Sequence, residues 1–586
     1  MGTWTVRRTM AAAVVTGLLA TQAPAPAQRG EARRASTAPG IVPADVADRY
    51  LAVRPPLGPV TVVDVAGESA DRLLLATTLQ GTVNRTSARI YLLGARSRAE
   101  DQRWIDDYLT RGLITVAETI DLDAALGEFA AELDGYVVAD PTEPWTVNTA
   151  TTVAGVRRGV VATPSTLGAV QAAGLAELED HRGRWSDAAT AYASVLADHR
   201  GELRLATTAL QQPDRHAPRD LYVQQGLFVA YTRPAQADFD AVYDLLETLP
   251  ADHPLYGYVS DTGEEEVQAI IRLSLDGRFL IPTDTASNLS FHLAVGGAER
   301  AVPSRTEADV APCRPDDLNV VLALSDGDNL TIPLAYDPRP ENWASPRRGE
   351  LPVGWGITPA ASILLPAIWD RYVGETTDAD EIVDIMGLGY SYGSAMPNAA
   401  AHHAAGERLR AALGVRAHWS LDALLSEPDA GGWDAVEGAW ASTGERPSGV
   451  LLNYGVWPGP AWFRTDTGVP VLASRQDSYD DGPAELAAQL RRLQEADPAD
   501  RPLVSFFAVT VWTSTYDELV TAMAPLQAEG VRFLTPSEAF ACLPADDGRA
   551  PGSSTTTTAA PAPTEPTPGP KAPAAGPIDG AATYVG

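Results

Sequence analysis

The sequence predicts an α/β protein with one or more open α/β domains in its N-terminal half and a (β/α)-barrel-like domain in its C-terminal half. Two observations give this fold class. From about residue 43, short apolar runs alternate with helical patterns, as they do in parallel sheets. After residue 318, strand-like runs recur between helices as far as residue 543, a spacing typical of a (β/α) barrel.

The N-terminal α/β region covers residues 43–300 in this interpretation. Its strands are predicted at residues 60–65, 88–93, 135–139 and 159–162, and its helices at residues 71–83, 99–110 and 122–133. Residues 167–200 are mostly helical by period and propensity. Residues 296–317, which include residues 301–317, carry Gly, Pro, Ser and scattered charges without periodicity. We therefore place the domain boundary here and interpret residues 301–317 as the linker that precedes the second domain, residues 318–544.

Both ends of the chain have the composition of segments outside a folded core. Arg7 and Arg8 precede a short apolar run and then small-residue cleavage sites, so residues 1–27 are predicted to be a signal peptide. A polar leader, residues 28–42, and a Thr-, Pro- and Ala-rich tail, residues 545–586, are predicted to be disordered. We therefore expect a secreted, extracellular protein.

Composition excludes several classes of partner. The hydrophobic fraction is 45% and the charged fraction 20%, which is typical of globular domains. The formal net charge is −32 with no basic stripe, which argues against nucleic acid and anionic membrane surfaces as partners. No segment after the signal has the apolar length of a membrane span.

The stretch that organises the C-terminal half is residues 318–329. An unbroken apolar run, typical of a strand buried on both faces, stops at Ser325-Asp326-Gly327-Asp328-Asn329. In α/β folds, functional groups gather at the carboxyl ends of such strands. An Asx turn that caps the next helix is the structural alternative. We interpret Asp326 and Asp328 as catalytic carboxylates.

Other predicted strand ends carry carboxylates, amides and aromatic rings. The residues concerned are Tyr390 and Tyr392 after residues 381–386, Asn453 and Tyr454 after 449–453, Arg475 and Asp477 after 469–474, and Trp512 after 502–511. Aromatic faces pack against sugar rings, while amides and carboxylates bind hydroxyl groups. We therefore predict that, together with Asn329, the aromatic, amide and arginine members of this set bind a carbohydrate.

Glycoside hydrolysis requires a carboxylic acid and a second carboxylate on either side of the scissile bond. Because Asp326 and Asp328 are only two residues apart, a partner from another strand end is more natural. Asp477 is the first candidate and Asp384 the second, although Asp384 lies within a predicted strand and could face a helix.

We expect neither a metal nor another cofactor. His402 and His403 are adjacent, so they cannot share one helix face as the metal-binding histidines of polysaccharide deacetylases do. A calcium-binding loop is not expected either, because Leu330 stands where such a loop needs an oxygen ligand. No Gly-rich phosphate loop and no G-x-S-x-G nucleophile motif is present.

The two cysteines, Cys313 and Cys542, are predicted to form a disulfide. Export favours the oxidised form. Cys313 precedes the first barrel strand and Cys542 follows the last helix signal, and the first and last strands of a closed barrel are neighbours.

Several motifs resemble those of one family. Gly387-Leu388-Gly389-Tyr390-Ser391-Tyr392 resembles the signature of the GxGYxYP putative glycoside hydrolases, except that Gly393 stands at the family's proline position. The segments 79–85, 89–92, 287–290, 325–329 and 354–359 resemble its other motifs, in order along residues 45–543. We add Trp355, from the last of these, to the predicted sugar-binding residues.

The resemblance implies a carbohydrate-active enzyme with a barrel-like C-terminal domain. Our first hypothesis is a secreted glycoside hydrolase that uses paired carboxylates. The alternatives are a non-catalytic carbohydrate-binding protein on the same scaffold and a deacetylase-like enzyme that acts on acylated sugars.

Overall fold

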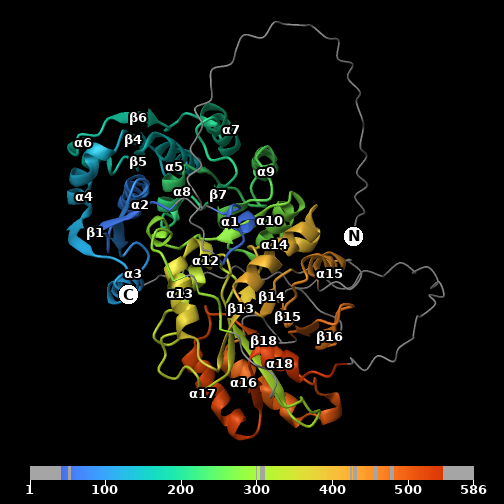
Figure 1. The fold of residues 1–586 in the computed structure, drawn as a ribbon. Helices are drawn as coiled ribbons and strands as arrows, with labels where there is room; N and C mark the ends of the chain where they lie inside the picture. The colour runs from blue at the N-terminus through green and yellow to red at the C-terminus, as the bar shows by residue number, and fades with distance from the viewer. Residues whose placement is uncertain are drawn as a thin grey trace, which may run out of the picture. The chain divides into compact units, whose positions relative to one another are not determined.

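The computed structural model describes residues 41–50, 54–298, 300–303, 310–422, 425, 432–453, 460–474 and 481–545 (Figure 1). The described residues up to Leu543 belong to one compact unit. Within that unit the fold is mixed α/β, with parallel sheets in the N-terminal part and a curled half-barrel sheet in the C-terminal part. The predicted fold class is thus confirmed. The predicted signal peptide and leader, except for Ile41 and Val42, and almost all of the predicted tail lie outside the described residues.

Two three-stranded parallel sheets begin the fold. Their orders are β2-β1-β3 and β5-β4-β6. The strands are β1 (Leu57–Asp64), β2 (Ala88–Leu93), β3 (Val116–Asp121), β4 (Gly135–Val138), β5 (Gly159–Ala162) and β6 (Glu177–Asp180). The helices of this region are α1 (Ala44–Ala47), α2 (Ala70–Asn84), α3 (Arg98–Thr110), α4 (Leu122–Phe129), α5 (Trp145–Arg157), α6 (Leu167–Ala172) and α7 (Ala188–His199), with a 3₁₀ turn at Ala130–Glu132.

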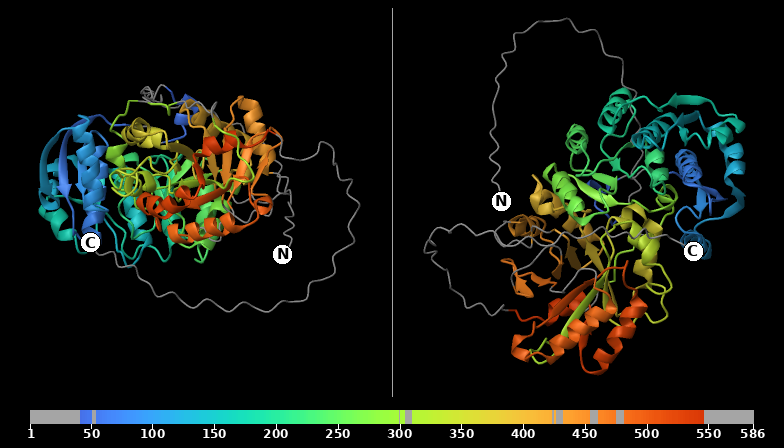
Figure 2. Two further views of the ribbon diagram at one scale, coloured as in Figure 1. Left: turned by 90° about the horizontal axis from the view of Figure 1, so that it is seen from below. Right: turned by 180° about the vertical axis from the view of Figure 1, so that it is seen from behind.

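A four-stranded parallel sheet follows, in the order β10-β9-β7-β8. Its strands are β7 (Thr208–Leu210), β8 (Phe228–Ala230), β9 (Pro254–Gly257) and β10 (Phe279–Pro282). Its helices are α8 (Arg219–Gln225), α9 (Phe239–Glu247), α10 (Gly263–Leu275) and α11 (Leu289–His292). In the two views of Figure 2, the green and yellow middle of the chain lies between the blue strands of the first sheet and the red C-terminal helices.

The C-terminal sheet has nine strands, which run β16-β17-β15-β14-β13-β12-β11-β18 with β19 also paired to β11. The strands are β11 (Asn319–Leu324), β12 (Val353–Gly356), β13 (Asp380–Ile385), β14 (Ala417–Ser420), β15 (Gly449–Leu452), β16 (Trp462–Arg464), β17 (Pro470–Ala473), β18 (Ser505–Val509) and β19 (Arg532–Leu534). The helices are α12 (Ala361–Leu364), α13 (Pro366–Glu375), α14 (Ala399–Ala412), α15 (Gly432–Thr443), α16 (Pro483–Glu495), α17 (Tyr516–Ala528) and α18 (Pro536–Cys542). Short 3₁₀ turns lie at Gly393–Ala395 and Pro498–Asp500, and a π-helical turn at Ile332–Tyr336.

Strand β11 is the centre of the half-barrel. All six of its residues are buried, as its unbroken apolar run predicts. One edge pairs with β18, and the other is divided between β19, opposite Asn319–Val321, and β12, opposite Ala323 and Leu324. Alternate side chains therefore pack into two cores: Val321 and Ala323 face the inside of the curled sheet with Trp419 and Phe506, whereas Val320, Leu322 and Leu324 face outward.

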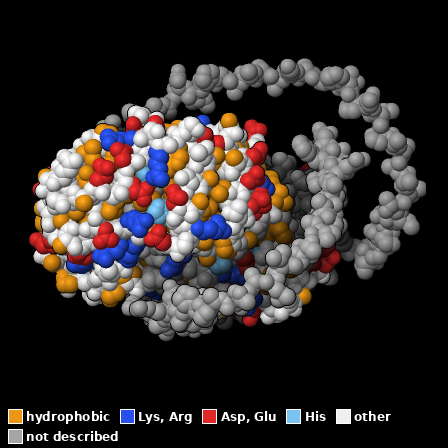
Figure 3. Space-filling view, turned by 90° about the horizontal axis from the view of Figure 1, so that it is seen from above, with side chains coloured by type: hydrophobic (Ala, Val, Ile, Leu, Met, Phe, Trp, Pro, Cys, Tyr) orange, Lys and Arg blue, Asp and Glu red, His pale blue; other side chains and the backbone are white. Residues whose placement is uncertain are grey.

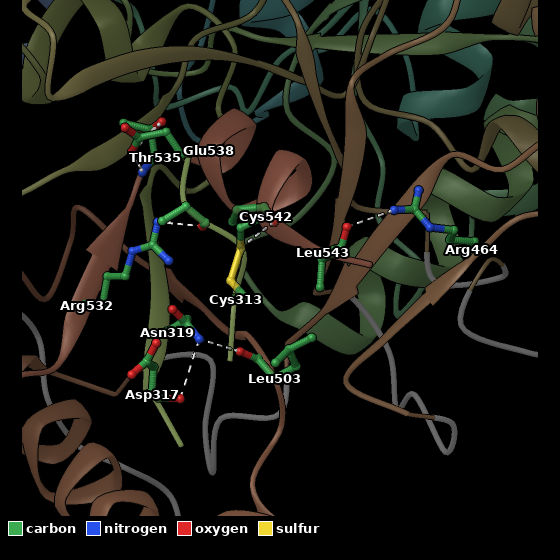
Figure 4. Close-up of a disulfide and its surroundings, with 12 residues drawn as sticks. Cys313, Asp317, Asn319, Arg464, Leu503, Arg532, Thr535, Glu538, Cys542 and Leu543 are labelled. Atoms are coloured by element: carbon green, nitrogen blue, oxygen red, sulfur yellow. Dashed lines mark hydrogen bonds between the residues drawn. A yellow bond between two sulfur atoms is a disulfide. The ribbon is translucent and has the colours of Figure 1, made fainter. Parts of the chain in front are cut away.

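Helix α18 closes the inside of the half-barrel near its start. A capping box between Thr535 and Glu538 begins the helix, and Phe540 packs where a Cβ on Gly449 would stand, 2.3 Å from that position. The predicted disulfide is present: Cys313 and Cys542 are bonded, with their Cα atoms 5.0 Å apart, and the backbone N–H of Cys313 donates to the Cys542 carbonyl (Figure 4). The bridge thus joins the segment before β11 to the last helix.

Some strands gave no clear signal in the sequence. The helical interpretation of residues 167–200 misses β6, and the predicted barrel misses β12 and β14. These strands are four residues long, and none is an unbroken apolar run: polar residues flank the single leucine of β6, and glycine or polar residues alternate with apolar ones in β12 and β14. Hydrogen bonding to neighbouring strands therefore decides their conformation.

On the face drawn in Figure 3, acidic and basic side chains are interspersed. Among the described residues, no helix combines the length and the apolar character needed to cross a membrane.

Candidate functional site

The turn after β11 is held by Ser325. Its hydroxyl accepts from the backbone N–H of Gly327 at 3.2 Å and donates to the carbonyl of Gly356 at 3.0 Å. Gly327 has a φ of +89°, which an L-residue rarely adopts. Because Ser325 supplies this turn contact, the Asp328 side chain is not required as a cap, and no described backbone N–H donates to it.

The carboxyl end of β10 lies directly against this turn. The backbone N–H of Leu330 donates to the Pro282 carbonyl at 3.1 Å. The hydroxyl of Thr331 donates to Oδ1 of Asp284 at 3.4 Å. The carboxyl edges of the four-stranded sheet and of the half-barrel therefore converge, and they bring together four carboxylates that we call the acidic cluster: Asp326, Asp328, Asp284 and Glu266.

The carboxyl group of Asp328 is strongly perturbed by its surroundings. It retains some exposed surface, but the protein surrounds it closely, and this burial raises the pKa of its carboxyl group well above the usual range. The negative charges of Asp284, Asp326 and Glu266 raise that pKa further, and Arg215 opposes them. Asp328 is therefore a carboxyl group that keeps its proton to a higher pH than an isolated carboxylic acid does.

The other cluster members have direct partners. Glu266, on α10, accepts hydrogen bonds from the hydroxyl groups of Tyr258 at 2.8 Å and Tyr390 at 2.7 Å. Asp284 forms an ion pair with Arg215, which also contacts Asp261 at 2.8 Å. Burial raises the pKa of Asp284 as well, against the effect of Arg215. Because Arg215 pairs with Asp284 directly, the positive charge favours the ionised form of Asp284 more than that of Asp328.

Trp512 stands beside Asp326. Its indole N–H donates to Oδ2 of Asp326, and it is 42% exposed, more than any other tryptophan that the structure describes. Tyr336, in the π-helical turn, packs edge-on against it with ring centroids 4.2 Å apart. Arg339 lies over the Tyr336 ring, 4.1 Å from its centroid. An exposed aromatic surface therefore adjoins a carboxylate at the end of β18.

The two signature tyrosines are core residues. Tyr390 is 3% exposed and Tyr392 is 0% exposed, so neither ring offers a face to sugar, contrary to the sequence prediction. The loop instead attaches to the four-stranded sheet: Tyr390 and Leu280 exchange backbone hydrogen bonds of 2.8 and 2.7 Å. At Gly389, with φ +156°, a Cβ would lie 2.7 Å from the Leu280 carbonyl oxygen, which explains the glycine.

The remaining predicted site residues are either buried, hydrogen-bonded within the protein or outside the described part of the chain. Trp355 is fully buried on β12 and donates to Asp380 Oδ1 at 2.9 Å, so it is a packing residue and not a sugar contact. Asn329 is 2% exposed at the turn, and Asn453 Oδ1 accepts from the indole N–H of Trp419 at 2.5 Å. The predicted site residues Tyr454, Arg475 and Asp477 lie outside the described residues.

Asp384 points away from the inside of the half-barrel. Its neighbours Val383 and Ile385 face the inside, so strand alternation turns Asp384 outward. There its Oδ2 contacts His418 Nδ1 at 3.1 Å and its Oδ1 accepts from Gly387 N–H at 2.9 Å. Asp384 and His418 line a cavity with residues of α14, so the Asp384 carboxylate is engaged there with His418 and the Gly387 N–H.

The N-terminal motifs bind one another. Asn288 Oδ1 accepts from Gln80 Nε2 and from the Leu92 backbone N–H, both at 2.7 Å. Asn84 Nδ2 donates to Ser290 Oγ at 3.0 Å. These buried amides join α2, β2 and α11, so their role is structural.

Sequence reasoning missed Glu266, Asp284 and Arg215. They stand far from residue 326 in the chain, and only the convergence of two sheets brings them to it. The sequence did contain one signal for two of them: Asp284 follows the end of β10 and Arg215 follows the end of β7, where functional residues of α/β folds gather. Among the described residues, no group of three His, Cys, Asp or Glu is arranged to hold a metal ion.

Three family models match the chain in order. Residues 61–131 match "GxGYxYP_N 1st domain", residues 133–200 match "GxGYxYP_N second domain", and residues 318–432 match "GxGYxYP putative glycoside hydrolase C-terminal domain". Glu266 and Asp284 fall between these matches and Trp512 after them.

A solved structure shares the fold. It is described as a putative hydrolase from Bacteroides thetaiotaomicron VPI-5482; the TM-score is 0.69 at 19% sequence identity, over 84% of this chain and 96% of that chain. No curated protein is significantly similar. Both descriptions are of hydrolases. The ordered family matches, the signature loop and the half-barrel together identify the chain as a member of the GxGYxYP family.

Proposed function

We propose that this protein is a glycoside hydrolase in which Asp328 is the general acid and Asp326 the general base or nucleophile. Cleavage of a glycosidic bond needs one carboxylic acid that keeps its proton and one ionised carboxylate. The single observation that carries the proposal is the acidic cluster, because it favours a proton on Asp328 at a pH where an isolated carboxylic acid has lost it.

The surroundings of Asp326 suit the second role. An indole N–H can only donate a hydrogen bond, so the contact from Trp512 leaves Asp326 as the acceptor. The exposed ring of Trp512 offers a face to the C–H side of a sugar. Substrate bound on this ring would therefore lie next to Asp326, within the same junction as Asp328.

Asp477 remains the alternative for the ionised partner, as the sequence suggests. Comparison of the Asp326→Asn and Asp477→Asn variants separates the two. The partner of Asp328 is the residue whose loss removes hydrolysis while substrate binding persists. We also propose that the protein acts outside the cytoplasm, which the disulfide between Cys313 and Cys542 supports.

The test is a screen for reducing-sugar release from a panel of polysaccharides, oligosaccharides and 4-nitrophenyl glycosides. Asp328→Asn is expected to lower kcat by about 10²–10⁴-fold on any substrate found. Asp500→Asn, at an exposed aspartate of the same half of the chain, is the matched control. Absence of hydrolysis across the panel, or full activity in Asp328→Asn, contradicts the proposal.

A further inference from the structure

The four-stranded sheet has a topological switch point between β7 and β9. Leu221 and Tyr222 of α8 pack on the same face as Ala209 of β7. Ile270 of α10 packs on the opposite face, with Leu210. The connections that leave neighbouring strands β7 and β9 therefore part toward opposite faces, and in open α/β sheets the crevice formed in this way is where ligands bind.

A hollow lies at this crevice. It has a volume of about 230 Å³ and is lined by the segments after β7, β8 and β9. The side chains that matter to the argument are Gln212, Asp214, Tyr231, Arg233 and Ser260. Its volume is below the roughly 300–1,000 Å³ typical of pockets that enclose drug-sized ligands, so it suits one small ring.

The hollow is joined to the acidic cluster through Arg215. Asp261, on the wall of the hollow, contacts Arg215 at 2.8 Å. Arg215 in turn pairs with Asp284, whose charge acts on Asp328. One arginine therefore links the wall of the hollow to the cluster that holds the proposed acid.

The chemistry of the hollow fits a neutral sugar better than an anion. Arg215 is paired with two aspartates, and Arg233 Nη1 lies 3.7 Å from Glu265 Oε2. The positive charge is thus balanced locally, which disfavours a phosphate or sulfate. Carboxylate, amide and guanidinium groups beside a half-buried tyrosine provide both hydroxyl partners and a ring face.

We propose that this hollow is a subsite for a neutral sugar unit of the same chain that the acidic cluster cleaves, so that the substrate is an oligosaccharide or polysaccharide. The inference rests on the proposed function. It adds that the substrate has more than one sugar unit. Tyr231 supplies the ring face and Arg233 a donor for hydroxyl groups. Glycosides with a single sugar unit would leave the hollow empty.

The first experiment measures binding without turnover. The Asp328→Asn protein is titrated with neutral oligosaccharides of one to six units, alone and combined with Tyr231→Ala or Tyr231→Phe. Tyr231→Ala should weaken binding of the longer oligosaccharides by about tenfold, the order expected for loss of an aromatic contact. Tyr231→Phe keeps the ring and should bind as the parent does. Equal affinity in the Ala and Phe proteins, or no binding to any oligosaccharide, overturns the subsite.

The second experiment separates the two proposals. On the wild-type background, Tyr231→Ala should lower kcat/KM for oligosaccharides several-fold more than for 4-nitrophenyl monoglycosides. If the wild-type protein hydrolyses both and Tyr231→Ala lowers both equally, the subsite is wrong and the hydrolase stands. If the Asp328→Asn protein binds oligosaccharides through Tyr231 but wild type cleaves none, the subsite stands and the hydrolase is wrong.

Discussion

The hydroxyl of Tyr390 donates a 2.7 Å hydrogen bond to Oε1 of Glu266. Tyr390 belongs to the family signature after β13, whereas Glu266 belongs to α10 and the acidic cluster around Asp328. The signature loop thus connects the two sheets whose carboxyl edges converge at the candidate site. Tyr390 therefore bears on the site through its hydrogen bond to Glu266, while its ring is buried in the core.

Glu266→Gln should shift the pH dependence of hydrolysis. The negative charge of Glu266 helps raise the pKa of Asp328, so its removal lowers that pKa. A general acid loses its proton, and with it its catalytic function, as pH rises through its pKa. The alkaline limb of kcat against pH should therefore move to lower pH in Glu266→Gln, while Asp500→Asn leaves it in place. An unchanged limb would show that Asp328 is not the acid.

Asp328→Asn should stabilise the protein at alkaline pH. The pKa of Asp328 in the folded state lies well above the unfolded value of about 3.9. The folded state then binds more protons than the unfolded state between these two values, so wild-type stability falls as pH rises through this window. The Asp328→Asn variant has no titrating group at this position, so its free energy of unfolding does not fall for this reason.

The melting temperature measures this effect. We expect Asp328→Asn to melt roughly 1–4 °C above wild type at pH 8 and the difference to shrink toward pH 4. A lower melting temperature at pH 8 would instead assign Asp328 a stabilising structural contact.

Gly389→Ala should destabilise the junction between the sheets. A Cβ at this position meets the Leu280 carbonyl oxygen at 2.7 Å, and φ is +156°. Because backbone must move, we expect a loss of about 2 kcal/mol or more. Gly438→Ala is the matched control: it lies inside α15 with no atom near its Cβ position and should gain about 0.5–1 kcal/mol. Thermal unfolding compares them, and equal effects would refute the close-approach argument.

Loss of the disulfide should lower stability. The bridge between Cys313 and Cys542 closes a loop with a sequence separation of 229, and removal of such a bridge costs about 2–5 kcal/mol. The Cys313→Ser/Cys542→Ser protein should melt below oxidised wild type, and reducing agent should bring wild type down to the variant. Two titratable thiols in the denatured, unreduced protein would show that the bridge does not form.

The sequence by itself determined the longer apolar strands and the floor of the candidate site. The apolar run of β11 is long enough to require burial on both faces, and the residues after it favour a turn, so Asp326 and Asp328 had to emerge at a strand's carboxyl end. The pairing of Cys313 with Cys542 followed because no other cysteine competes. These features depend on the local pattern of residues and on the number of cysteines in the chain.

Only the tertiary structure decided which groups meet. Glu266, Asp284 and Arg215 reach Asp328 because two sheets present their carboxyl edges to each other, a relation that no local pattern records. Burial removed Trp355, Tyr390 and Tyr392 from the sugar-binding set, since an aromatic residue at a strand end can serve packing as well as binding. Strand alternation turned Asp384 outward to His418, because the curl of the sheet, and not the sequence, decides which face is the inside.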